Sequence, residues 1–251
     1  MTGDNDWHEQ DDLWRVFRRA VYPEAILDLA PDEVEGVVEL AGLEPGDCVL
    51  DMPCGIGRHA VELAERGFDV TGVDRTRAYL DVARERAAER GVDVEWVRDD
   101  MREFARQGMF DVGINLYTSL GYFDRREENL AVLENIRLSL ADGGALVVDL
   151  AGKELLAADY QAKTWEKLDD GLYRLSERWP AEGWEWMENR WILVRDDGPN
   201  REFRLRHRLY SAVELRELIR DAGFESVEIY GDWEGGEYGP EAERLIAVAR
   251  S

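Results

Sequence analysis

The residues best suited to hold a nucleotide-like ligand lie in one segment, residues 49–74, which reads VLDMPCGIGRHAVELAERGFDVTGVD. Gly55 and Gly57 allow a tight turn and a close approach of the backbone to a ligand, just after an apolar run that ends at Asp51. The helical pattern that follows would offer unpaired amide groups and the positive end of a helix dipole. A second apolar run ends at Asp74, whose carboxylate could hold two vicinal ribose hydroxyls. The segment therefore predicts one crevice that contains both the glycine turn and Asp74.

The spacing within this segment separates two kinds of cofactor. Residues 55–60 satisfy G-x-G-x-x-A, a pattern that also occurs in dinucleotide-binding oxidoreductases. Those proteins place the first glycine almost directly at the strand end to receive a pyrophosphate, whereas here residues 51–54 intervene. The carboxylate of Asp51 would repel a pyrophosphate, but it suits the ammonium group of a methionine moiety, directly or through water. An NAD(P)-dependent oxidoreductase is therefore the alternative, and the less favoured one.

Short apolar runs alternate with helical runs from Asp47 to Leu150, a pattern that predicts crossover units on a parallel sheet. Helices cover both faces of such a sheet, and ligands bind at the carboxyl ends of its strands. Residues 10–42, before this region, predict two helical stretches. The expected strands are residues 48–51, 69–73, 93–97, 110–116 and 145–150, and the expected helices are residues 58–66, 77–89 and 127–140.

After residue 160 the pattern changes to period-two runs separated by turn-like segments, which predicts a small antiparallel β-meander. Ser211 then begins a helix that ends at Gly223, with Glu214 placed to complete a capping box. The three strands expected in the meander are Leu172–Trp179, Trp184–Arg195 and Glu202–Tyr210, and two last strands of the main sheet are expected at residues 227–230 and 245–249.

These elements predict a single domain of the α/β class. The expected fold is a Rossmann-like, doubly wound, mostly parallel seven-stranded sheet, with the β-meander inserted after the fifth strand. The domain would comprise an N-terminal helical segment (residues 1–44), a core (45–160 and 211–251) and the inserted β lid (161–210).

At these motifs the sequence resembles the class I S-adenosylmethionine-dependent methyltransferases, whose first motif reads like D-x-x-C-G-x-G. Residues 99–101 resemble the acidic motif of that family. The resemblance implies that Asp100 accepts from the adenine amino group and that the Met101 amide meets the ring, with Asp99 as the alternative acid. Residues 110–123 resemble the family's fourth strand and the loop after it, which implies that a carbonyl near Leu116 takes the methionine ammonium.

The resemblance implies an enzyme that uses S-adenosylmethionine and releases S-adenosylhomocysteine. Its expected reaction is in-line methyl transfer to a small-molecule acceptor, for which the protein aligns the reactants and excludes water. A base matters only for an acceptor that must lose its proton early; the catalytic candidates are Tyr117, Tyr122 and His207, with His59 as a further one. The implied cofactor site comprises Tyr22, Asp51, Pro53, Cys54, Gly55, Gly57, Asp74, Arg75, Asp99, Asp100, Met101, Leu116 and Tyr117.

Several of these residues have a structural interpretation as well. His207 shares strand parity with Phe203 and Leu205, so it belongs to an apolar face and can equally be a core residue. Cys54 is expected to pack under the cofactor as a small residue, and Tyr22 to contact the cofactor from the N-terminal segment. A non-catalytic cofactor-binding protein is the third functional alternative, which the long meander and an intact loop after the fourth strand argue against.

The meander contributes two further groups of candidates. Its arginines are expected to pair with carboxylates, with an anion site for the substrate as the alternative. Some of its tryptophans are expected to face the acceptor, because small-molecule pockets use aromatic walls. The arginines are Arg190, Arg195, Arg201, Arg204, Arg206 and Arg208, and the tryptophans are Trp179, Trp184, Trp186 and Trp191.

Composition limits the remaining functions of the 251-residue chain. A formal charge of −24 opposes binding to nucleic acid, and an acid excess of this kind is typical of proteins from salt-loving organisms. The apolar runs are too short to cross a membrane, and the acidic start does not resemble a secretory signal, so we expect a cytoplasmic protein. Its two cysteines suggest neither a disulfide nor a zinc site, and a monomer or a homodimer is expected.

Overall fold

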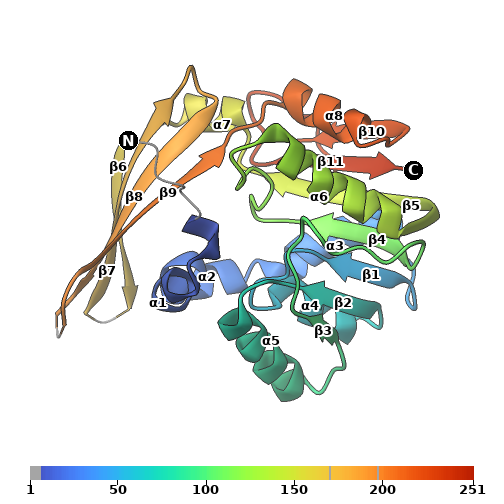
Figure 1. Ribbon diagram of the computed structural model, residues 1–251, viewed down its shortest axis with the longest axis horizontal. Helices are drawn as coiled ribbons and strands as arrows, with labels where there is room; N and C mark the ends of the chain where they lie inside the picture. Colours follow the sequence, from blue (N-terminus) through green and yellow to red (C-terminus); the bar gives the residue numbers. More distant parts are fainter. Residues whose placement is uncertain (1–6, 170, 197) are drawn as a thin grey trace.

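The computed structural model describes residues 7–169, 171–196 and 198–251, so the first half of the acidic N-terminus lies outside the described residues (Figure 1). A seven-stranded sheet forms the core, with strand order β10-β11-β5-β4-β1-β2-β3. Only β11 runs antiparallel to its neighbours β5 and β10. The predicted mostly parallel, seven-stranded sheet is therefore confirmed. Its strands are β1 (Cys48–Asp51), β2 (Asp69–Val73), β3 (Glu95–Val97), β4 (Phe110–Asn115), β5 (Leu140–Leu150), β10 (Ser226–Tyr230) and β11 (Leu245–Arg250).

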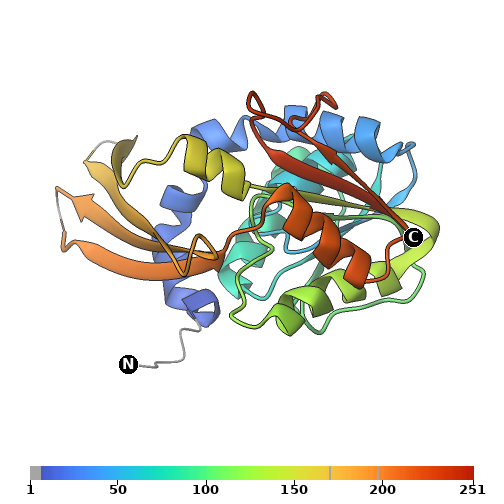
Figure 2. The same ribbon diagram turned by 90° about the horizontal axis from the view of Figure 1, so that it is seen from above.

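Helices cover both faces of this sheet because its central strands are apolar on both sides, as parallel strands require (Figure 2). Helices α3 (Ala30–Ala41) and α4 (Arg58–Glu65) pack on one face. Helices α6 (Arg126–Ser139) and α8 (Ala212–Asp221) pack on the other, and α5 (Arg77–Arg90) lies beside α4. The predicted capping box is present at the start of α8, where Ser211 and Glu214 each accept a backbone amide of the other. Among the described residues, no helix is long and apolar enough to cross a membrane.

The inserted meander is a separate four-stranded antiparallel sheet, which lies beside the carboxyl edge of the core (Figures 1 and 2). It follows α7 (Lys153–Ala158), and its strands are β6 (Lys163–Asp169), β7 (Leu172–Ala181), β8 (Trp186–Arg195) and β9 (Arg201–Arg208). Three of the four strands were predicted. The sequence of β6 gave no strand signal because its largest apolar side chain, Trp165, points outward and is 71% exposed, so no continuous apolar face marks the strand.

The N-terminal segment ties the meander to the core. It consists of a short 3-10 helix, η1 (Trp7–Glu9), followed by α1 (Asp11–Val21) and α2 (Glu24–Leu27). The ring of Phe17 in α1 lies 6.3 Å from that of Trp191 of the meander, and the ring of Trp14, one turn earlier in α1, lies 5.8 Å from that of Tyr79 of α5. These rings belong to one buried cluster that includes residues of the meander and of the core. The meander is therefore packed into the domain and is not a free flap.

Candidate active site

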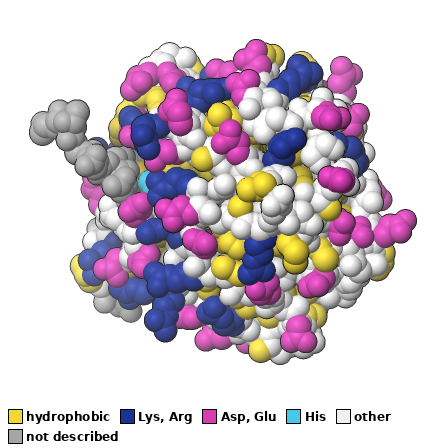
Figure 3. All heavy atoms as spheres, turned by 45° about the vertical axis from the view of Figure 1, so that its right-hand side comes forward, with side chains coloured by type: hydrophobic (Ala, Val, Ile, Leu, Met, Phe, Trp, Pro, Cys, Tyr) yellow, Lys and Arg dark blue, Asp and Glu magenta, His cyan; other side chains and the backbone are white. Residues whose placement is uncertain are grey.

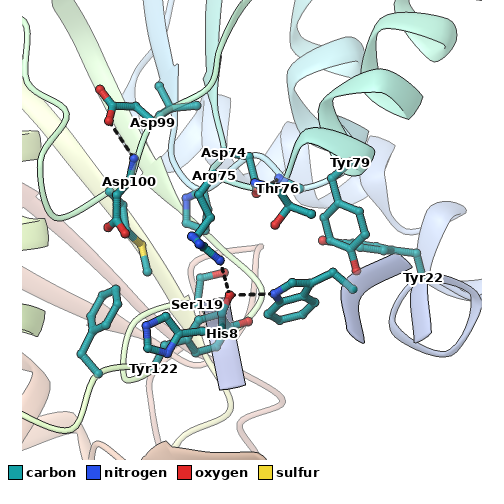
Figure 4. Close-up of a pocket in the computed structure, with 16 residues that line it drawn as sticks. His8, Tyr22, Asp74, Arg75, Thr76, Tyr79, Asp99, Asp100, Ser119 and Tyr122 are labelled. Carbon is teal, nitrogen blue, oxygen red and sulfur yellow. Dashed lines mark hydrogen bonds between the residues drawn. The ribbon is translucent and has the colours of Figure 1, made fainter. Parts of the chain in front are cut away.

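Two pockets open at the carboxyl ends of the strands, where the strand order reverses between β1 and β4. The first, which we call the acidic pocket, has an empty volume of about 590 Å³ that is partly open to solvent, and it is lined by Asp74, Asp99 and Asp100 (Figure 4). The second, the arginine pocket, has an empty volume of about 1450 Å³, also partly open to solvent, between the core and the inner face of the meander. It is lined by Arg58, Arg174, Arg178 and Arg244.

Asp74 connects the strand end to the glycine turn. Its carboxylate is 7% exposed and accepts the Gly55 amide at 2.9 Å and the Thr76 amide at 2.7 Å. Burial raises the pKa of Asp74 to about 6, although these hydrogen bonds favour the charged form. The carboxylate therefore orders the turn, and in Figure 4 it lies at the wall of the acidic pocket.

The second acidic motif lies on the loop after β3, on another wall of the same pocket (Figure 4). Burial disfavours the charge on Asp100, but hydrogen bonds from Arg102 outweigh it and lower the pKa of Asp100 below its ordinary value. The guanidinium of Arg102 donates to both oxygens of Asp100, at 3.0 and 2.8 Å. Asp99 accepts the Asp100 amide at 2.9 Å through one oxygen. Both acids of the motif line the pocket, and Asp100 is ionised at neutral pH.

The N-terminal segment covers the acidic pocket. The carbonyl of His8 accepts from the indole of Trp14 at 2.9 Å and from the guanidinium of Arg75 at 2.8 Å (Figure 4). Tyr22, at the end of α1, lines both pockets, and a Cβ atom on Gly55 would clash with its hydroxyl. Gly55, which has a φ of +55°, therefore lies directly beneath Tyr22.

Two predicted cofactor residues line neither pocket. Asp51 is 1% exposed, one of its carboxylate oxygens has no hydrogen-bond partner among the described residues, and burial raises its pKa to about 8. Gly57 has a φ of +72°, and a Cβ atom there would lie 2.6 Å from Trp96 and 2.9 Å from Ala83. A side chain at this position would therefore clash with β3 and α5, which is a structural reason for a glycine here.

The remaining predicted residues lie at one pocket or at both. The acidic pocket is lined by Tyr22, Pro53, Gly55, Asp74, Arg75, Asp99, Asp100, Met101 and Tyr122. The arginine pocket is lined by Tyr22, Pro53, Cys54, Leu116, Tyr117, Tyr122 and His207.

The loop after β4 forms the floor between the pockets. The Leu116 carbonyl accepts the Ser119 hydroxyl at 2.9 Å, and Tyr117 has a φ of +60°, a conformation rare for an aromatic residue. Asp149, at the end of β5, stabilises this backbone by accepting the Tyr117 amide at 3.0 Å. Burial raises the pKa of both Tyr117 and Tyr122, so their hydroxyls are protonated at neutral pH.

His59 and His207 both line the arginine pocket, in different surroundings. His59 lies 2.8 Å from a carboxylate oxygen of Glu33, and burial lowers the pKa of His59. His207 is on β9, and burial together with the charge of Arg178 lowers its pKa to about 4. Both imidazoles are therefore neutral at pH 7, and His59 already has a carboxylate partner.

Arg58, the first residue of α4, was not identified from the sequence. It is 3% exposed, pairs with Glu33 and donates to the Ile26 carbonyl at 3.2 Å. Its Nη2 atom is buried and has no hydrogen-bond partner among the described residues. A buried guanidinium nitrogen without a partner is costly, and Arg58 is one of the residues that line the arginine pocket. The feature of the sequence that could have indicated Arg58 is its position directly after the glycine turn.

The meander presents fewer aromatic rings to the pocket than predicted. Of the four tryptophans, only Trp191 lines it; Trp179 is 40% exposed, and Trp186 lies under Arg206 on the other side of the sheet. Four of the six meander arginines named from the sequence pair with carboxylates among the described residues, as the favoured interpretation predicts. These pairs are Arg190–Glu177, Arg204–Glu202, Arg206–Asp124 and Arg208–Glu185.

Comparisons with known proteins agree with this geometry. Residues 49–144 match a family described as "Methyltransferase domain". The chain is 26% identical to the glycine/sarcosine N-methyltransferase of Aphanothece halophytica over 217 residues, which cover 80% of this chain and 75% of that protein.

Solved structures give the same result over the full fold. The CcbJ methyltransferase from Streptomyces caelestis matches with a TM-score of 0.75 and 25% identity, over 88% of this chain and 90% of that one. The S-adenosylmethionine-bound amino pentose methyltransferase CalS10 from Micromonospora echinaspora matches with a TM-score of 0.65 and 26% identity, over 89% and 90%.

The fold and these similarities define a Rossmann-like transferase of one-carbon groups. The chain is a class I S-adenosylmethionine-dependent methyltransferase, of enzyme class 2.1.1. The residues at its strand ends suit this cofactor: carboxylates for hydroxyl and amino donors in the acidic pocket, and an unused buried guanidinium nitrogen for a carboxylate beside it.

Proposed function

We propose that the enzyme transfers the methyl group of S-adenosylmethionine to a small molecule held in the arginine pocket, by in-line displacement. The observation that carries this proposal is the junction of the two pockets. Both are lined by Trp14, Tyr22, Pro53, Ser119 and Tyr122. A cofactor whose adenosine fills the acidic pocket would thus have its sulfonium at this junction, with the larger arginine pocket beyond it.

We assign the cofactor contacts by the chemistry of each group. Asp74 would accept the ribose hydroxyls, while Asp100 or Asp99 would accept the adenine amino group beside the Met101 amide. At the other end, the Leu116 carbonyl would accept the methionine ammonium, and the free Nη2 of Arg58 would donate to the methionine carboxylate.

The bound cofactor supplies a methyl group that is already activated by the sulfonium charge. The protein's own residues then have to align the acceptor and exclude water. The aromatic rings packed around Tyr122, with Trp7 at 4.8 Å and Trp14 at 6.2 Å, would keep water away from the junction.

An amine is the acceptor that these residues favour. Neutral His207 and the protonated phenols of Tyr117 and Tyr122 are weak bases, and an unprotonated amine needs none to attack a methyl group. Two similar proteins are named as methyltransferases of glycine or sarcosine and of an amino pentose, which are small amines. The net charge of −24 also disfavours a nucleic acid substrate.

The test begins with the full chain, S-adenosylmethionine and a panel of small amines, amino acids and amino sugars, with S-adenosylhomocysteine formation as the readout. Ser176→Phe places a ring on the pocket side of β7. Leu175→Phe, the matched control, places it on the opposite face of the same strand, where Leu175 is 38% exposed.

We expect Ser176→Phe to reduce turnover at least about a hundredfold while its affinity for S-adenosylhomocysteine stays that of the wild type, because the ring fills acceptor space only. Leu175→Phe should keep the turnover and the S-adenosylhomocysteine affinity of the wild type. Full turnover by Ser176→Phe, or turnover with no member of the panel, would contradict the proposal.

A further inference from the structure

Arg178 differs from the other three arginines of the arginine pocket. Arg244 donates to both oxygens of Asp149, at 2.6 and 2.7 Å, and Arg174 pairs with Glu166. Arg58 pairs with Glu33. The guanidinium of Arg178 has neither an ion pair nor a hydrogen bond among the described residues, and no carboxylate from the described residues lines this pocket.

This arrangement is unexpected for a chain that has 55 acidic and 31 basic residues outside histidine. Among the described residues most arginines have an acidic partner, and four of those on the outer face of the same meander do, whereas Arg178, which faces the pocket, has none. A half-buried cation without a partner has lost part of its hydration and has gained no ion pair in return. The charge of Arg178 also contributes to the lowered pKa of His207.

The strand register places hydrogen-bonding groups beside Arg178. Asn189 of β8 lies directly opposite it, and both side chains line the arginine pocket. Ser176 is two residues away on β7, and therefore on the same face of the sheet. Ser176 and Asn189 are each 9% exposed, so this wall combines a charged donor with two buried polar groups.

The position of Arg178 separates it from the cofactor contacts. Arg58 belongs to α4 of the core and follows the glycine turn, whereas Arg178 belongs to β7 of the inserted meander. An anion bound by Arg58 is therefore on the core side of the pocket, and one bound by Arg178 is on the meander side.

We infer that the methyl acceptor carries an anionic group, a carboxylate or a phosphate, and that Arg178 binds this group with Asn189 and Ser176. The inference rests on the proposed function and deepens it by naming the acceptor's chemical class. The bound anion would hold the acceptor at the meander, so that its nucleophile points to the junction with the acidic pocket.

The experiment uses the full chain saturated with S-adenosylhomocysteine and three probes at constant ionic strength: acetate, inorganic phosphate and neutral acetamide. Calorimetry measures their affinity for the wild type, for Arg178→Gln and for Arg204→Gln. Arg204 is a matched control, because it lies on the outer face of β9, is 65% exposed and pairs with Glu202. Equal S-adenosylhomocysteine affinity in all three proteins shows that they are folded.

We expect acetate or phosphate to bind the wild type and Arg204→Gln, and to bind Arg178→Gln at least about tenfold more weakly. Acetamide should bind none of them. The stronger of the two anions identifies the acceptor's group. The inference is overturned if neither anion binds the wild type, or if both bind Arg178→Gln equally well.

Turnover separates this inference from the proposed function. If Arg178→Gln methylates the small-molecule acceptors as fast as the wild type, no anion is held there, and the inference fails while the proposed function stands. Anion binding at Arg178 without methylation of any small molecule would overturn the proposed function, and with it the assignment of the anion to an acceptor.

Discussion

The two pockets have opposite charge although they share a wall. The acidic pocket is lined by three aspartates and one arginine, and the arginine pocket by four arginines and no carboxylate from the described residues. On the surface, by contrast, acidic and basic side chains are interspersed over the face shown in Figure 3. The two pockets therefore differ in local charge, and the arginine pocket is opposite in charge to the chain as a whole, whose net charge is −24.

The pockets also differ in how the chain builds them. The acids of the acidic pocket come from the ends of adjacent strands: Asp74 directly follows β2, and Asp99 and Asp100 lie on the loop just after β3. The arginines of the arginine pocket come from α4, from β7 and from the segment before β11, which meet only after the meander has packed against α1. The acids of the acidic pocket are thus positioned by the strands that they follow. The arginine pocket, by contrast, depends on tertiary packing between distant segments.

The largest expected effect is on the acidic pocket, for Asp74→Ala. The substitution removes the proposed ribose contacts and leaves the amides of Gly55 and Thr76 without an acceptor. We expect S-adenosylhomocysteine affinity to fall by about 2–3 kcal/mol, roughly 30- to 150-fold, in a calorimetric titration. Asp81→Ala, on the exposed face of α5, is the control and should bind normally. Unchanged affinity would remove Asp74 from the site.

A smaller and more selective effect is expected for Arg58→Gln, which tests the boundary between the pockets. If its free nitrogen holds the methionine carboxylate, S-adenosylhomocysteine should bind about 10- to 100-fold more weakly. The affinity for 5′-methylthioadenosine, which lacks the amino acid group, should not change. Asp74→Ala should weaken both ligands.

The comparison of these two ligands is needed because Arg58 also pairs with buried Glu33. Loss of that pair will lower the stability of the variant, and stability alone would weaken both ligands alike. An equal loss for both ligands would therefore show that Arg58 has only a structural role.

The sequence predicted the fold and much of the acidic pocket for the same physical reason. A strand that ends in a polar residue places that residue at the carboxyl edge of a parallel sheet, so Asp74 could be placed without knowing any tertiary contact, whereas Asp100 was placed by the resemblance of residues 99–101 to the family's acidic motif. Gly57 shows the limit of this reasoning. It was assigned to the ligand, but Trp96 and Ala83 fill the space where its side chain would be.

The arginine pocket could not be predicted to the same extent. Strand parity did place His207 on the inner face of the meander, but it could not show which arginine lacks a partner, since that depends on the contacts of every neighbouring carboxylate. The tryptophans show the same limit: composition suggested an aromatic wall, and only Trp191 reaches the pocket because the others lie on the outer face or in turns.

The smallest expected effect concerns His207, which connects the charge of the arginine pocket to catalysis. Burial and the charge of Arg178 hold its pKa at about 4, below the ordinary value of 6.5. The imidazole is therefore neutral above about pH 5 and a poor general base, so His207→Gln should lower kcat less than about fivefold, against the 10²-fold or more lost with a general base.

Because protonation is disfavoured in the folded state, the contribution of His207 to the free energy of unfolding is present above about pH 6.5 and is lost as pH falls toward 4. NMR titration of His207 should find a higher pKa in Arg178→Gln than in the wild type, because one of its two causes is gone. An unchanged pKa of His207 in that variant would mean that burial alone lowers this pKa and that the charge of Arg178 has no effect on His207.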